Sequence, residues 1–272
     1  MKVALALTFY TLEFLKTWAW PEENCGQSVP SGGHIGRILA RQSRPARSGE
    51  HPWTVSIQMV NQTRHICSGS LITAEVVLTA AHCLEDQLPR KFKVIAGFTN
   101  KMESSPFIQK RFVLNYYLHE RFIDDIEHDL AIIKLKKPFS LYRSNGHIAP
   151  VCLARQGERV LNNVDVVAWK MESEDESSGR FLRTITLPIR KGSRCRSDVY
   201  YHNDRTTFCA GPKRGGKCVE DSGGPAVQED YFKVTQVGIL SYGKICHSQL
   251  GFFVRLSNYI DWIEEKLNTI KS

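Results

Sequence analysis

The chain has 272 residues, 42% of them hydrophobic, so it is long enough to bury a sizeable core, and an all-β domain of this length is often a single unit. Its eight cysteines lack the closely spaced pairs of a zinc ribbon, so we expect disulfides and no metal site. The net charge of +8 permits binding to acidic glycans. Nucleic acid is not an expected partner, because no recognition motif or aromatic-interleaved basic platform is present.

The chain opens with MKVALALTFYTL, a lysine followed by an apolar run, which is typical of a secretory signal. We predict a signal peptide over residues 1–20 and a secreted, extracellular protein. Glu13 and Lys16 interrupt this segment, and an ordinary buried N-terminal helix is the alternative. Residues 21–37 are polar and poor in strand formers, which predicts a pro-segment, and residues 38–272 follow as the mature domain. No other stretch has the ~20 apolar residues of a membrane span, so none is expected.

From Trp53 onward, short β-branched and aromatic runs alternate with polar turn clusters. The runs are WTVSIQMV, SLITAEVVLTAA, FKVIAGF, RFVLNYYL, DLAIIKL, VDVVAW, RTITLPI, VTQVGILSYG and GFFVRL. Many short strands at this spacing predict an all-β sandwich or barrel. The segment that begins at Asn61, NQT, is a candidate N-glycosylation site, which would make the protein a glycoprotein.

The last part of the chain changes its hydrophobic period. In SNYIDWIEEKLNTI, the residues Ile260, Ile263, Leu267 and Ile270 recur at helical spacing after a start at Ser257 and Asn258. This pattern predicts a terminal amphipathic helix packed on the barrel. The acidic stretch ESEDESSGR, residues 172–180, has no such period and predicts an exposed loop.

Three segments carry residue types suited to nucleophilic catalysis. CSGSLITAEVVLTAAHC ends beside His82, EHDLAIIKL places Asp129 at the start of a strand, and CVEDSGGP presents Ser222 on a bend that Gly223 and Gly224 permit. Taken singly, such a histidine is more often structural, and such an aspartate is more often a cap or turn residue. A serine hydroxyl is a weak nucleophile at neutral pH, so it needs a base that takes its proton.

In the order histidine, aspartate, serine, these motifs resemble those of the trypsin/chymotrypsin-like serine peptidases, from about Cys25 to Ile270. The resemblance implies two six-stranded antiparallel β-barrels with a C-terminal α-helix. It also implies an endopeptidase that hydrolyses peptide bonds through an acyl-enzyme, without a cofactor or metal. His82 would be the base, Asp129 its orienting partner and Ser222 the nucleophile. Protein or peptide substrates and serine peptidase inhibitors would be its partners.

The same resemblance implies how the cysteines pair. The pairs are Cys67 with Cys83, Cys195 with Cys209, Cys218 with Cys246, and Cys25 with Cys152, the last of which ties the pro-segment to the domain. Eight cysteines allow roughly a hundred pairings, so the sequence alone leaves other pairings open.

Glu220 stands where the family has glycine, and the backbone N–H groups of Glu220 and Ser222 would form the oxyanion hole. A glutamate there either turns its N–H away, at a cost of about a hundred- to a thousandfold in rate, or points to solvent and restricts which substrates approach. Two further departures replace glycines, with Lys170 after a tryptophan and Ser68 after Cys67.

The activation segment also departs from the family pattern. A trypsin-like peptidase that cuts after Arg37 would free Ile38, whose ammonium would pair with Asp221. Ala40 and Arg41 replace two glycines, so we expect a stiffer hinge and less efficient activation. The alternative is an exposed basic loop that is not processed.

The specificity pocket is only partly readable from the sequence. By the same resemblance its base falls near Gly216, where trypsin-like members carry aspartate, which argues against a preference for Arg or Lys. Gly243 and Gly251 resemble the two wall positions, with Ser241 beside them. A large apolar side chain would fit. Lys217 either favours an acidic side chain or is a surface charge.

Two functions from different classes follow. The complete triad favours an active peptidase, whereas Glu220, Ala40 and Lys170 favour a catalytically impaired homologue that binds a glycan, a membrane surface or a protein partner. An esterase of the α/β-hydrolase type is a poor match, since the Gly-x-Ser-x-Gly elbow and the order serine, aspartate, histidine are both missing.

Overall fold

The computed structural model describes residues 24–29, 43–102, 104–123, 127–169, 180–198, 202–212, 221–230, 233–243 and 250–271. Several residues that the sequence singles out therefore lie outside the described part: the predicted signal peptide, Arg37, Ile38, Ala40, Arg41, Lys170, Gly216, Lys217, Cys218, Glu220 and Cys246.

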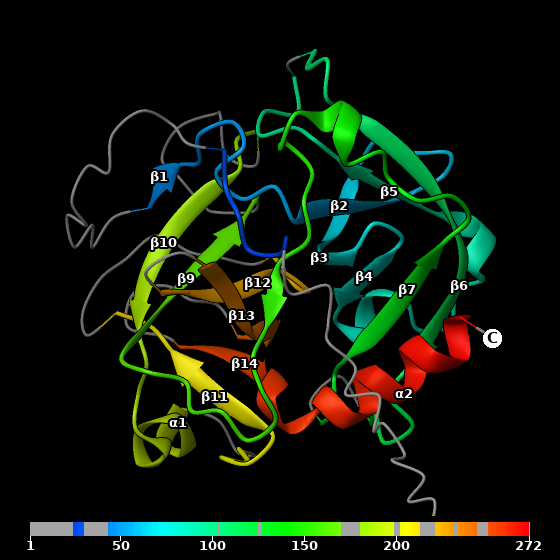
Figure 1. Cartoon of the computed structure of the whole chain (residues 1–272). Helices are drawn as coiled ribbons and strands as arrows, with labels where there is room; N and C mark the ends of the chain where they lie inside the picture. Colours follow the sequence, from blue (N-terminus) through cyan, green and yellow to red (C-terminus); the bar gives the residue numbers. More distant parts are fainter. Residues whose placement is uncertain are drawn as a thin grey trace, which may run out of the picture.

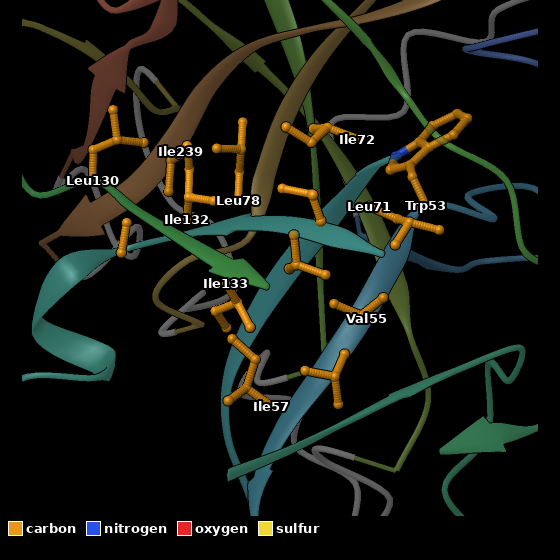
Figure 2. Packing of buried hydrophobic residues seen from close by; sticks show 14 of the residues in the cluster. Trp53, Val55, Ile57, Leu71, Ile72, Leu78, Leu130, Ile132, Ile133 and Ile239 are labelled. Carbon is orange, nitrogen blue, oxygen red and sulfur yellow. The ribbon is translucent and has the colours of Figure 1, made fainter. Parts of the chain in front are cut away.

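The first half of the domain is a closed antiparallel barrel of six strands (Figure 1). The strands are β2 (Thr54–Met59), β3 (His65–Thr73), β4 (Val76–Thr79), β7 (Ala131–Leu135), β6 (Gln109–Leu118) and β5 (Phe92–Ala96), in that order around the barrel. Alternate residues such as Val55 and Ile57 point inward and are fully buried with Leu71, Leu78 and Ile132, so the barrel is filled with side chains (Figure 2).

The second half is a curled sheet of eight strands. The strands are β1 (Arg44–Pro45), β8 (Cys152–Leu153), β9 (Asn163–Ala168), β10 (Arg183–Pro188), β11 (Thr207–Ala210), β12 (Pro225–Asp230), β13 (Lys233–Tyr242) and β14 (Gly251–Arg255). Its order is β1-β10-β9-β12-β13-β14-β11, and β8 pairs with β13. An isolated bridge between Ile189 and Ala210 brings the two ends of the curl together. The predicted all-β fold with two barrel-like halves is confirmed: the first half closes into a six-stranded barrel, whereas the second is a curled half-barrel sheet that also includes β1 and the parallel strand β8.

Helices are few and short. They are α1 (Gly192–Asp198), α2 (Ile260–Lys271) and the 3-10 turns η1 (Ala81–Cys83), η2 (Pro89–Lys91), η3 (Tyr142–Ser144) and η4 (Leu256–Asn258). The predicted terminal helix is present, but α2 begins at Ile260 because η4 occupies the positions before it. Ile260, Ile263 and Leu267 are buried in the first-barrel core. Neither α1 nor α2 has the length and apolar character of a membrane-spanning helix.

The two halves share a core and a set of strand ends. Val227, Ile239 and Val254 of the second sheet belong to the same buried cluster as the first barrel. A hydrogen bond of 2.6 Å from Ser70 Oγ to Gln236 Oε1 also joins β3 to β13. The three motif residues lie near strand ends. His82 is in η1, which follows β4, Asp129 precedes β7, and Ser222 precedes β12 (Figure 1).

Candidate active site

His82 and Asp129 form a close pair between the two halves. His82 Nδ1 lies 2.7 Å from Asp129 Oδ2, and the His82 backbone N–H donates to Asp129 Oδ1 at 3.0 Å. Ser241 Oγ donates to Oδ2 of the same carboxylate at 2.5 Å. The Asp129 side chain is fully buried, whereas the His82 side chain is 22% exposed. The carboxylate therefore fixes the inner nitrogen of the imidazole, and the other nitrogen, Nε2, lies 3.8 Å from Cys83 Sγ.

Local backbone features hold both partners. η1 carries His82 directly after β4, and the disulfide from Cys83 to Cys67 ties this turn to β3. Asp129 follows His128, which adopts a positive φ of 54° and whose carbonyl accepts the N–H of Leu130 at 2.7 Å. This tight bend lets Asp129 face η1 while Leu130 enters the core.

The serine loop packs on the same segment. Ser222 is partly buried, and its carbonyl accepts the N–H of Ser68 at 2.9 Å. Gly223 has a φ of 79°, and a Cβ there would lie 2.3 Å from Thr79 Oγ1 and 3.3 Å from the nitrogen of Ala80. Only glycine fits this close approach. Since Thr79 and Ala80 lead into η1, the structure places the Ser222 loop against the segment that carries His82.

A second buried aspartate lies one residue before the serine. Asp221 Oδ1 is 2.7 Å from His65 Nε2, and Oδ2 accepts from Ser68 Oγ at 2.8 Å and from the backbone N–H of Trp169 at 2.6 Å. The other ring nitrogen of His65 lies 2.8 Å from Ser56 Oγ. Both side chains are almost completely buried, so the Asp221 pair has no contact with solvent.

Opposing effects act on the Asp221 carboxyl. Desolvation by burial would raise its pKa, but the His65 charge and the hydrogen bonds from His65, Trp169 and Ser68 outweigh burial and lower the pKa below its ordinary value. The carboxyl is therefore ionised at neutral pH. The Asp221 carboxylate, which is the expected partner of the Ile38 ammonium, is already bonded to His65, Ser68 and Trp169 in this chain.

Sequence reasoning missed the roles of His65 and Ser56. His65 is 156 residues from Asp221 in the sequence, and no local pattern links the two. Ser68 was noticed only as a replaced glycine, and its contact with Asp221 supplies the physical reason for a hydroxyl at that position.

Three disulfides join described cysteines. They are Cys25–Cys152, Cys67–Cys83 and Cys195–Cys209, with Cα–Cα distances of 5.0, 6.2 and 5.8 Å. These are the partners that the family resemblance implies. The first bond anchors the segment 24–29, which includes part of the predicted pro-segment, to β8.

Of the expected pocket residues, three are described. Ser241 turns its hydroxyl to Asp129, as described above. Gly243 has a φ of 90°, and a Cβ there would lie 2.5 Å from the Leu250 carbonyl oxygen. Gly251 is buried in β14, opposite Ala210 of β11. The backbone therefore requires glycine at Gly243, independently of any substrate.

Two further sequence predictions concern the surface and metals. Asn61 is exposed in the turn after β2, where an attached glycan would meet solvent. Within the described residues, one group brings three potential metal ligands together, namely Cys67, His82 and Cys83. The two cysteines are joined in a disulfide and present no thiolate to a metal.

Comparison with known proteins agrees with this geometry. The sequence model of the family described as trypsin matches residues 40–263. The chain belongs to the trypsin family. Coagulation factor IX from Oryctolagus cuniculus is 30% identical to it over 250 residues, which cover 88% of each chain. The trypsin-family match spans both sheets and ends within α2.

Proposed function

We propose that this trypsin-family protein is a secreted serine endopeptidase, made as a zymogen and activated by cleavage after Arg37. The observation that carries the proposal is the Asp129 pair, in which a buried carboxylate orients a partly exposed imidazole at 2.7 Å. Ser222 is its nucleophile, because the Ser222 loop packs on the segment that leads to His82.

The proposed reaction has two halves. Ser222 Oγ attacks the peptide carbonyl carbon while its proton passes to His82 Nε2, and Asp129 stabilises the resulting imidazolium. His82 then gives the proton to the leaving amine, which leaves an acyl group on Ser222. A water molecule then attacks the acyl carbon and gives its proton to His82, and the carboxylic acid product leaves Ser222 as that proton returns to its hydroxyl. The N–H groups of Glu220 and Ser222 receive the developing oxyanion, as the sequence expectation assigns them.

Activation would act through Asp221. In the uncut chain its carboxylate is held by His65, Ser68 and Trp169. The ammonium of Ile38, freed by cleavage, would take the carboxylate from His65. Asp221 directly follows Glu220 and precedes Ser222, so this exchange would move the loop that forms the oxyanion hole. The uncut chain is thus expected to have low activity.

The setting and partners follow from the same proposal. The three disulfides and the exposed Asn61 support an extracellular, glycosylated protein. An Arg-specific trypsin-like peptidase would activate it, and protein substrates and serine peptidase inhibitors would bind its active site.

A second candidate is a catalytically impaired homologue that binds acidic glycans, a membrane surface or a protein. Glu220 favours it, because a side chain replaces glycine at an oxyanion donor, and so does the net charge of +8.

Covalent labelling by a fluorophosphonate, before and after verified cleavage at Arg37, tests both candidates, with Ser222→Ala as the control. Labelling that appears on cleavage and is absent from the variant supports the enzyme. No labelling of the correctly cleaved chain would contradict the enzyme and favour the binding protein.

A further inference from the structure

Two turns of the chain share a sequence pattern, Arg-x-Gly-Glu, and one geometry. They are Arg47–Glu50, RSGE, and Arg155–Glu158, RQGE. In the first, Glu50 N–H donates to the Arg47 carbonyl at 3.1 Å and Glu50 Oε2 accepts the Arg47 N–H at 2.8 Å. In the second, Glu158 makes the same two bonds to Arg155, at 3.0 and 2.7 Å.

The glycines of the two turns also share one backbone conformation. Gly49 and Gly157 have φ values of 75° and 73°, which a type II turn requires of its third residue. In each turn the glutamate therefore binds both backbone polar groups of the arginine, and the arginine carbonyl is already an acceptor within the turn.

This geometry opposes proteolysis after the arginine. A peptidase that recognises substrate backbone binds it in extended form, and its oxyanion hole must receive the carbonyl oxygen of the bond to be cut. Arg47, Ser48, Arg155 and Gln156 are all exposed, so exposure alone would mark both bonds as cleavable. Each turn must open before cleavage, which makes the cleavage rate depend on the population of the open form.

The first turn is held by more contacts than the second. Both carboxylate oxygens of Glu50 bind the Arg44 guanidinium, with Arg44 Nη1 at 2.9 Å from Oε2. Ser28 Oγ donates to the Glu50 carbonyl at 2.8 Å, and the Val29 N–H donates to the Gly49 carbonyl at 3.0 Å. The segment 24–29 thus packs on this turn.

The Glu50 charge persists at any physiological pH. Burial would raise the pKa of the Glu50 carboxyl, but the bond from Arg44, the neighbouring His51 and the Arg47 N–H lower it to about 2.

Among the described residues, the second turn has one contact of this kind with the rest of the domain, in which the Gly157 N–H donates to the Ser257 carbonyl at 2.8 Å.

We propose that the Arg47–Glu50 turn is a clip that withholds the Arg47–Ser48 bond from the Arg-specific peptidase that activates the chain, with Glu50 as the residue that closes it. The inference rests on the proposed activation after Arg37. Hydrolysis at Arg47 would add water across the bond between the Arg47 carbonyl carbon and the Ser48 nitrogen. The products are a carboxylate on Arg47 and an ammonium on Ser48.

Cleavage at the clip would destroy the zymogen instead of activating it. Arg37, Arg41, Arg44 and Arg47 lie within one short stretch of chain. A cut after Arg47 breaks the chain between Ile38 and the domain, so that residues 1–47 stay attached only through the Cys25–Cys152 bond, and it leaves a terminus ten residues further on, at Ser48. That terminus lacks the residues that would carry an ammonium to Asp221.

The test is a time course of trypsin digestion of the full chain carrying Ser222→Ala, which prevents self-cleavage. Samples are reduced, because the Cys25–Cys152 bond would keep the fragments together, and new termini at Ile38, Ser48 and Gln156 are quantified by mass spectrometry. The parent chain is compared with Glu50→Ala and with its matched variant Glu158→Ala.

In the parent, the Ile38 terminus is expected first and the Ser48 terminus last. Glu50→Ala is expected to raise the rate at Ser48 about tenfold or more and to leave the rate at Gln156 unchanged, and Glu158→Ala to do the reverse. A parent chain cut at Arg47 as fast as at Arg37, or an unchanged Ser48 rate in Glu50→Ala, would overturn the proposal.

A general loosening of the chain is a separate outcome with its own control. If Glu50→Ala raises both the Ser48 and the Gln156 rates, Glu50→Gln decides, because its amide keeps one oxygen as the acceptor for the Arg47 N–H and loses the charge and the second acceptor for Arg44. A rise of a few fold confined to Ser48 supports the clip, and an equal rise at both sites contradicts it. The digestion does not need the chain to be an active enzyme. Failed fluorophosphonate labelling would therefore contradict the proposed function without changing the cleavage rates measured here.

Discussion

Within the described residues, two aspartate–histidine pairs with a fully buried carboxylate share the same 2.7 Å contact and differ in their surroundings. In the Asp129 pair, the carboxylate is buried and the imidazole of His82 is 22% exposed. In the Asp221 pair, the side chain of His65 is only 2% exposed, and Ser56 occupies its second nitrogen.

This difference in exposure supports the proposed role of His82 as the base and argues against such a role for His65. Both carboxylates hold a ring nitrogen, but the His82 side chain is 22% exposed, whereas that of His65 is 2% exposed. His65 is bonded on both sides inside the core, so its pairing with Asp221 contributes stability and order to the uncut chain. Access of solvent and substrate to the second nitrogen therefore decides the role of each pair, not the contact between the two residues.

The largest expected effect comes from replacing the histidine of each pair by alanine. After cleavage at Arg37, His82→Ala should lower hydrolysis of a small ester at least about a thousandfold, because Ser222 loses its base, and should change the melting temperature little. His65→Ala should spare that rate and destabilise the uncut chain by about 3 kcal/mol. Ester hydrolysis and calorimetry measure the two effects. Equal losses of rate in both variants would erase the distinction between the pairs.

The next effect concerns the Asp221 charge. Asp221→Asn should lower the free energy of unfolding of the uncut chain by about 3 kcal/mol at pH 7, because a buried carboxylate that accepts from His65, Ser68 and Trp169 is replaced by an amide with only one acceptor oxygen. The pKa of the wild-type carboxyl is lowered in the fold, so its contribution is fully present above about pH 4 and is lost as the pH falls through the folded-state pKa. The stability difference from wild type should therefore shrink below pH 4.

Urea unfolding at pH 7, 4 and 3 measures this difference. Asp86→Asn is the control, since Asp86 is exposed and its φ of 57° is tolerated by asparagine. A difference that stays constant from pH 7 to pH 3 would show that folding does not shift the pKa of Asp221, and a difference that grows as the pH falls would show that the carboxyl is neutral in the fold.

The smallest effect distinguishes the two serines around the Asp221 pair. Ser68→Ala removes a hydrogen bond to a carboxylate and should cost about 2 kcal/mol, whereas Ser56→Ala removes one to the imidazole and should cost about 1 kcal/mol. Thermal unfolding of the uncut chain should rank the two variants in this order. A larger loss for Ser56→Ala would mean that the imidazole, and not the carboxylate, is the group that the network stabilises.

Much of the fold was predictable from local pattern. Each of the nine apolar runs contains a strand, because a short β-branched and aromatic run bounded by turn residues is a local signal. The run that begins at Ser70 is divided by a turn at Ala74 and Glu75 into β3 and β4. The expectation missed β11, β12 and the two-residue strands β1 and β8. β12 ends in the polar residues Gln228, Glu229 and Asp230, which hide its short apolar start.

The candidate site was predictable only where a motif surrounds each residue. His82, Asp129 and Ser222 each lie in a recognisable segment, and the structure adds the 2.7 Å contact between the first two. Ser241 was expected at the pocket, and only the structure reveals its bond to Asp129. The predictions for Glu220, Gly216 and Lys217 lie outside the described residues and stay predictions.

The sequence by itself determined the class of fold, the terminal helix and the three motif segments, because periodicity and turn chemistry are local properties. Only the tertiary structure decided which distant groups meet. The Asp221 pair joins residues 156 positions apart. The bond from Ser28 to the Glu50 carbonyl holds the segment 24–29 on the turn that follows β1. Such contacts arise when a barrel closes and brings separate strand ends together, and no local pattern of the chain records which ends will be neighbours.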